Sequence, residues 1–149
     1  MAVLRDTPYR NTHFLVDLGG GSEGPAAGFS HVELPDISID VIQYRTGNQP
    51  NSDIQEIPGQ AHYRNVTLRR GLIGSLDLYE WIDQVRNGDG NARRNVTISL
   101  LSEDRTTVVF VWKLIRTFPV KYTFGDLNAK GTDVAIEELV LAYDRLELE

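Results

Sequence analysis

Hydrophobic and polar residues alternate along several stretches of the chain, and a period of two is typical of strands that turn one face toward a core. Ile37, Ile39 and Val41 alternate with polar residues, which predicts a half-buried strand. Segments 65–68 and 95–100 are rich in β-branched residues and also favour strands. The pattern therefore predicts a largely β protein.

The C-terminal half continues this pattern with two longer runs. Residues 108–114 are mostly apolar at both odd and even positions, which predicts a strand that is covered on both faces. In the last run, 134–148, the apolar positions change phase, and we interpret this as a bulge near Glu137 and Glu138 within one long strand.

One segment, about 75–87, has the spacing of an amphipathic helix instead. Ser75 is placed to cap its start, and Asn87 with Gly88 favours a left-handed stop at its end. Tyr79 and Trp81 are two residues apart and point in nearly opposite directions on a helix, so only one of them can face the core squarely.

Two turn-rich segments interrupt the predicted strands. The glycine-rich stretch 17–25 lacks the frame of a nucleotide-binding loop, and we interpret it as a hairpin connection. The stretch 46–60 is longer than most connections in compact domains, which favours a function for it. Within it, Ile54 and Ile57 would allow a short edge strand to form.

Taken together, these elements predict the fold class. We expect a single domain over residues 1–149, mainly β, in which two antiparallel sheets form a β-barrel or sandwich with one α-helix at about 75–87. A long loop at about 46–60 belongs to the same domain.

Composition narrows the function classes. The 149 residues include no cysteine, which excludes disulfides and thiolate metal sites, and the net charge of −6 disfavours sequence-specific nucleic-acid binding. We expect the doublets Arg69-Arg70 and Arg93-Arg94 to be solvated or to contact another subunit. The start of the chain predicts no secretory signal, so we expect cytoplasmic synthesis.

No constellation of residues predicts catalysis or a cofactor. The three histidines are scattered, and the pairs Glu80 with Asp83 and Glu137 with Glu138 are expected to be solvated. We therefore expect no enzyme activity, no cofactor and no metal. An alternative function is a monomeric ligand-binding β-sandwich with an aromatic platform, formed by Tyr44, Tyr63, Trp112 and Tyr122.

Short motifs in order along the whole chain carry a family resemblance. They are Phe14-Leu15-Val16-Asp17, Gly28-Phe29-Ser30, residues 42–48 (IQYRTGN), Ile57-Pro58-Gly59, residues 66–71 (VTLRRG), residues 78–81 (LYEW), residues 93–98 (RRNVTI), Trp112 with residues 118–121 (FPVK), and Asp126-Leu127-Asn128 with Ala135-Ile136-Glu137. In this order they resemble the inner tube proteins of contractile phage tails and contractile injection systems.

The resemblance implies a structural role. Such proteins form homohexameric rings that stack into a hollow tube inside a contractile sheath, with baseplate or spike and tube-terminating proteins as partners and effector cargo possible in the lumen. It implies assembly in a bacterial or archaeal cytoplasm and action in a virion tail, an extracellular particle or a cell-anchored apparatus. The candidate contacts between subunits or rings are Gly47, Asn48, Gln49, Pro50, Asn51, Ser52, Asp53, Ile54, Ile57, Pro58, Arg5 and Tyr9.

Overall fold

The computed structural model describes residues 2–19, 28–48, 50 and 52–149. In this part of the chain it has nine strands and one α-helix. In chain order they are β1 (Phe14–Asp17), β2 (Phe29–Glu33), β3 (Ile37–Tyr44), β4 (Gln55–Tyr63), β5 (Val66–Gly71), α1 (Asp77–Arg86), β6 (Arg94–Leu101), β7 (Val108–Phe124), β8 (Ile136–Ala142) and β9 (Arg145–Leu148). The expected mainly β class with one helix is confirmed.

Two antiparallel sheets share the long strand β7. Its first part pairs with β6 and β9, and its last part pairs with β8, which is followed by β5 and β2. The change of sheet occurs near Arg116, whose φ of 54° lies in the left-handed region and whose N–H donates to the Asn95 side chain at 3.1 Å. The sheets are sandwich-like and do not close into a barrel, since in the described residues β1 pairs only with β6 and β2 only with β5.

The connection between β1 and β2 differs from the hairpin that the sequence predicted. The two strands pair with different partners and lie at opposite ends of the strand order, so they are not the arms of one hairpin. Most of the glycine-rich stretch itself falls outside the described residues.

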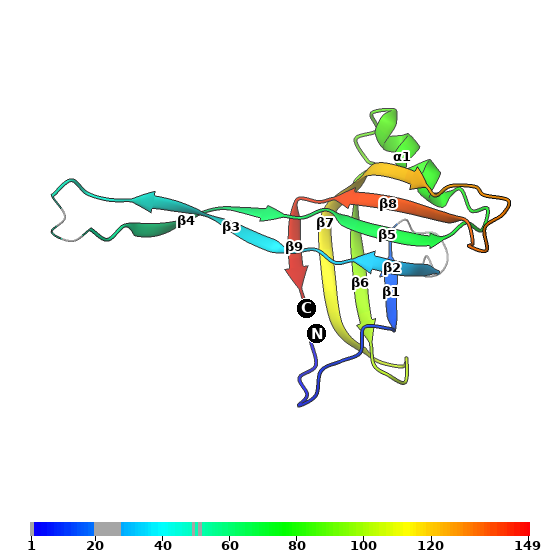
Figure 1. Cartoon of the computed structure of the whole chain (residues 1–149), viewed down its shortest axis with the longest axis horizontal. Helices are drawn as coiled ribbons and strands as arrows, with labels where there is room; N and C mark the ends of the chain where they lie inside the picture. The colour runs from blue at the N-terminus through cyan, green and yellow to red at the C-terminus, as the bar shows by residue number, and fades with distance from the viewer. Residues whose placement is uncertain (1, 20–27, 49, 51) are drawn as a thin grey trace.

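The core lies between the two sheets, and α1 covers one end of it (Figure 1). Trp81 is fully buried and its Nε1–H donates to the Ala92 carbonyl at 2.7 Å, whereas Tyr79 is 43% exposed. The expectation that only one of these two aromatic residues faces the core is confirmed. The core also holds Val16, Phe29, Val66, Leu68, Leu78, Val96, Ile98, Leu114, Leu139, Leu141 and Leu146.

The two ends of α1 differ in how well the sequence predicted them. At the C-terminal end, Gly88 has a φ of 78°, its N–H bonds to the Val85 carbonyl, and the Asp89 N–H bonds to the Gln84 carbonyl, which together form a Schellman motif. At the N-terminal end, Ser75 is not the cap, because Leu76 holds that position with no side-chain capping bond. The Ser75 hydroxyl instead donates to the Asp77 carboxylate at 2.8 Å.

The bulge expected near Glu137 and Glu138, within one long strand, is not present in the described C-terminal residues. The C-terminal run forms two strands, β8 and β9, and β8 is regular from Ile136 to Ala142, with Glu137 buried on the same face as Leu139 and Leu141. The apparent change of phase arises because a charged residue occupies a core position. The irregularity in this pairing lies on the neighbouring strand, between Pro119 and Lys121.

Candidate assembly interface

The most conspicuous surface feature is a two-stranded ribbon, formed by β3 and β4, that projects far from the two sheets (Figure 1). The ribbon continues the pairing of β2 with β5, because β3 follows β2 directly and β4 leads into β5. All eight residues of β3 are exposed. The expectation of a half-buried strand after Pro35 is therefore wrong for the isolated chain.

The expected loop at 46–60 is shorter than predicted. Residues 55–63 form β4, so the connection between the ribbon strands covers 45–54. Ile57 and Pro58 lie within β4, where Ile57 pairs with Ile42 and Pro58 with Val41. A proline is tolerated here because both strands of a two-stranded ribbon are edges.

The other predicted contact residues lie in two separate places. Gly47, Asn48, Pro50, Ser52, Asp53 and Ile54 lie in the connection at the far end of the ribbon, while Gln49 and Asn51 fall outside the described residues. Arg5 and Tyr9 belong to the N-terminal segment, which lies at the body beside the first part of β7, far from that tip (Figure 1). The structure therefore does not bring the two groups together within one subunit.

Arg5 and Tyr9 hold the N-terminal segment on its own chain. The Arg5 guanidinium lies over the Tyr9 ring at 3.9 Å and pairs with Glu103 at 2.7 Å, and the Tyr9 hydroxyl donates to the Val3 carbonyl at 2.9 Å. The hydrogen bond from Arg5 is the largest cause that lowers the pKa of Glu103 to about 2. Val3 in turn bonds to the Val109 carbonyl of β7.

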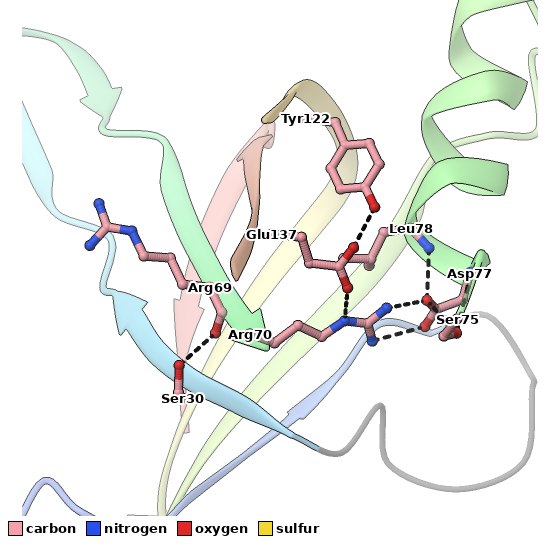
Figure 2. Close-up of polar contacts among 8 residues, drawn as sticks. All are labelled: Ser30, Arg69, Arg70, Ser75, Asp77, Leu78, Tyr122 and Glu137. Carbon is pink, nitrogen blue, oxygen red and sulfur yellow. Dashed lines mark hydrogen bonds and ion pairs between the residues drawn. The ribbon is translucent and has the colours of Figure 1, made fainter. Parts of the chain in front are cut away.

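A buried ionic cluster, which the sequence patterns did not predict, lies beneath the start of α1 (Figure 2). Arg70 of β5 donates through Nε to Glu137 of β8 and through its terminal nitrogens to Asp77 of α1. Tyr122 of β7 donates to the second oxygen of Glu137. Four elements are therefore joined by charged groups and one tyrosine hydroxyl, and Arg70 and Glu137 are at most 2% exposed.

The electrostatics of this cluster follow from burial and pairing. Burial alone would raise the pKa of Asp77, but the hydrogen bonds from Arg70 and Ser75 outweigh it and lower that pKa. Burial, together with the hydrogen bond to Glu137, raises the pKa of Tyr122 well above its usual value. The expectation that Arg70 and Glu137 are solvated or subunit-contact charges is therefore wrong, because each satisfies the other inside the core.

The alternative aromatic platform is not assembled. Tyr63 packs on Tyr143, Trp112 on Phe110 and Tyr122 on Phe124, and Tyr44 lies near the far end of the ribbon.

A separate cavity of about 260 Å³ lies beside the N-terminal segment and is lined mainly by apolar residues of β1, β2, β6 and β7. Within the described ranges, no group of three or more His, Cys, Asp and Glu residues could hold a metal ion.

The sequence matches a family model described as T4-like virus tail tube protein gp19 over residues 10–147. The chain belongs to this tail tube family. No curated protein matches it at a significant level. Over the residues whose placement is described, none of the helical structure is long and apolar enough to span a membrane.

Solved structures agree with the family. The chain is 29% identical to a chain of an extracellular contractile injection system, the PVC sheath-tube complex in the extended state, with a TM-score of 0.82 over 95% of this chain and 91% of that chain. It is 27% identical to a chain of the anti-feeding prophage tube terminating cap structure, with a TM-score of 0.84 over 100% and 95%. Hcp1 from Flavobacterium johnsoniae, at 14% identity and a TM-score of 0.52 over 91% and 93%, shares the fold.

These findings confirm the resemblance stated from the sequence motifs. The tail tube protein described here is a structural subunit of a contractile phage-tail-like injection system.

Proposed function

We propose that this tail tube protein closes into homohexameric rings and that the β3–β4 ribbon links each subunit to neighbouring subunits in the stacked tube. The observation that carries the proposal is the ribbon itself, a lone two-stranded hairpin with apolar side chains exposed along its length. An isolated hairpin of this kind is marginally stable in water, and a second copy that covers it would remove the exposed apolar area from solvent.

Free sheet edges support ring closure. In the described residues, β1 and β2 each pair along one side only, which leaves backbone donors and acceptors on their outer sides. A contact between two different surfaces, repeated with a rotation that closes, forms a ring. The edges and the ribbon supply two such different surfaces on one chain.

The mechanism we propose is mechanical. A contractile sheath drives the stacked tube through a target envelope, and the tube transmits force and can enclose effector cargo without any bond chemistry. Baseplate or spike proteins and a tube terminator would contact the two ends of the stack. The chains similar to this one come from sheath-tube, baseplate and cap structures, which supports these partners. Assembly in a bacterial or archaeal cytoplasm, for use in a virion tail, an extracellular particle or a cell-anchored apparatus, is part of the same proposal.

Light scattering after size-exclusion chromatography, over a range of concentrations, tests the proposal. We expect a species of six times the monomer mass, and negative-stain images of larger fractions should show rings or tubes with a central hole. The same measurement is repeated beside a preformed baseplate, which supplies a nucleus for assembly. A chain that stays monomeric under both conditions would contradict the proposed ring closure.

A deletion tests the role of the ribbon tip. Removing 48–53 leaves 45–47 and 54 to connect the strands, and a four-residue connection still closes a hairpin. We expect a cooperative, β-rich circular-dichroism spectrum and loss of stacked assemblies. Tubes that are unchanged by the deletion would show that the tip makes no essential contact.

A further inference from the structure

The ribbon joins the body through a neck, which we define as residues 34–36 and 64–65 (Figure 1). All of these residues are described, and none of them belongs to a strand. The pairing of β3 with β4 forms a sheet of its own, separate from the sheet that contains β2 and β5. Pro35 also has no N–H to donate to a ladder. The described strands of the ribbon and of the body are therefore not joined by a continuous ladder.

Side chains take the place of ladder bonds at Arg64. Its backbone N–H donates to the Asp36 carboxylate at 3.1 Å, and its guanidinium donates to the Leu34 carbonyl at 3.1 Å. The guanidinium also lies 3.7 Å from the Asp36 carboxylate. These contacts tie the two halves of the neck to each other.

A tyrosine ties the neck to the body. Tyr143, directly after β8, donates its hydroxyl to the Arg64 carbonyl at 2.7 Å, and its ring lies on Tyr63 with the ring centres 5.7 Å apart. Burial is the largest cause that raises the pKa of Tyr143 to about 12, so at neutral pH the hydroxyl keeps the proton that it donates. Side chains therefore hold both backbone groups of Arg64, one from the neck and one from the body.

We infer that the neck is a hinge and that these contacts of Asp36, Arg64 and Tyr143, which we call the latch, set the direction of the ribbon. With the latch closed, the ribbon keeps one direction relative to the body. With the latch open, the ribbon turns as a rigid body, because a few residues outside regular structure are enough to absorb the change in φ and ψ. A ribbon whose direction is set in advance also meets a partner with a smaller loss of conformational freedom.

The length of the ribbon makes a turn at the neck measurable. From Asp36 to Tyr44 the extended chain spans about 25 Å at the usual rise of a strand. A turn of about 15° at the neck would therefore move Tyr44 by about 6 Å relative to the body. Distances between two spin labels resolve a displacement of this size.

Double electron–electron resonance on the free subunit tests the hinge, and the chain has no cysteine of its own to interfere. Lys121→Cys on β7 with Tyr44→Cys at the end of β3 reports the distance across the neck. Ser38→Cys with Tyr44→Cys reports a distance within the ribbon. Each pair of labels is measured with the latch intact and with the latch removed by Asp36→Ala and Tyr143→Phe together.

A matched control makes the same two kinds of change in the N-terminal segment. Glu103→Ala with Tyr9→Phe removes one carboxylate that pairs with an arginine and one tyrosine hydroxyl that donates to a backbone carbonyl. Asp36 is exposed and Phe keeps the ring of Tyr143, so the latch variants should fold. Asp36→Ala is also measured alone, and it should widen the distance distribution across the neck in the same direction but by less.

With the latch intact, we expect a single narrow distance distribution from both pairs of labels. Removing the latch should widen the distribution across the neck at least about twofold and leave the distribution within the ribbon unchanged. The N-terminal control should change neither distribution.

Three results would overturn the inference. They are a wide distribution across the neck while the latch is intact, no widening after the latch is removed, and widening within the ribbon, which would show that the ribbon itself loosens. All of these measurements use the monomer, at a concentration where light scattering reports one. A failure of the chain to form rings would therefore bear on the proposed function and not on the hinge.

Discussion

The buried pair of Arg70 and Glu137 should be strongly coupled in stability. Glu137→Met replaces the carboxylate with an apolar side chain of similar length and leaves Arg70 held only by Asp77, with the Tyr122 hydroxyl without its acceptor. Removing one partner of a buried pair typically costs about 3–5 kcal/mol. Because Asp77 still pairs with the guanidinium, we expect a loss near the lower end, about 3 kcal/mol.

The double variant gives the magnitude of the coupling. Arg70→Met alone leaves the fully buried Glu137 carboxylate with Tyr122 as its only partner here, and we expect a loss of about 3–5 kcal/mol. Arg70→Met combined with Glu137→Met buries no unpaired charge, so its loss should stay below about 2 kcal/mol. The sum of the two single losses would then exceed the double loss by about 4 kcal/mol or more.

The assay is urea unfolding followed by tryptophan fluorescence, at a concentration where light scattering reports a monomer. The neighbouring exposed pair provides a matched control: Arg69 and Glu138 lie on the same two strands, with side chains 39% and 29% exposed. Glu138→Met should cost less than about 1 kcal/mol. A Glu137→Met loss as small as this control, or strictly additive losses in the double variant, would refute the reasoning.

Acid should weaken the same cluster. The pKa of Asp77 is lowered in the folded state, so its contribution to stability is present above its ordinary pKa of 3.8 and is lost as pH falls through the lower folded value. The double variant lacks the Arg70 partner, and its stability should therefore change less between pH 5 and pH 2. An equal slope in both proteins would contradict this account of Asp77.

Two further substitutions test individual contacts by the same urea assay. Trp81→Phe removes the donor to the Ala92 carbonyl and should cost about 1–3 kcal/mol, while Tyr79→Phe on the exposed side of α1 should cost less than about 0.5 kcal/mol. Gly19→Ala should cost more than about 1–2 kcal/mol, since Gly19 has a φ of 67° and a Cβ would lie 2.4 Å from the Asn95 carbonyl oxygen. Its control, Gly47→Ala, meets no atom within 4 Å and should be near neutral.

Local sequence signals predicted the elements whose causes are local. The helix spans Asp77–Arg86, inside the expected 75–87, because its apolar spacing and its glycine stop are set by neighbouring residues. The cap at Ser75 was wrong for a non-local reason. The Asp77 carboxylate, which accepts the Ser75 hydroxyl, is also bound by Arg70 of β5, and a local pattern does not show that partner.

The burial of Arg70 and Glu137 could not be predicted from local sequence signals. Arg70 and Glu137 are 67 positions apart, and only the pairing of β5 with β8 brings them opposite each other. A charged residue at a position that faces the core interrupts the alternation of apolar and polar residues. The sequence pattern therefore indicated a bulge. One signal was available: with Glu137 included, residues 137, 139 and 141 keep a single unbroken phase.

The ribbon shows a different limit of sequence patterns. The alternation of Ile37, Ile39 and Val41 correctly indicated a face that needs a cover, but periodicity carries no information on whether the cover belongs to the same chain. Leu139 and Leu141 of β8 are buried in a core cluster with residues of other elements of the same chain, whereas the side chains of β3 are exposed. An apolar strand face that its own fold leaves exposed, as on β3, therefore indicates a partner outside the subunit.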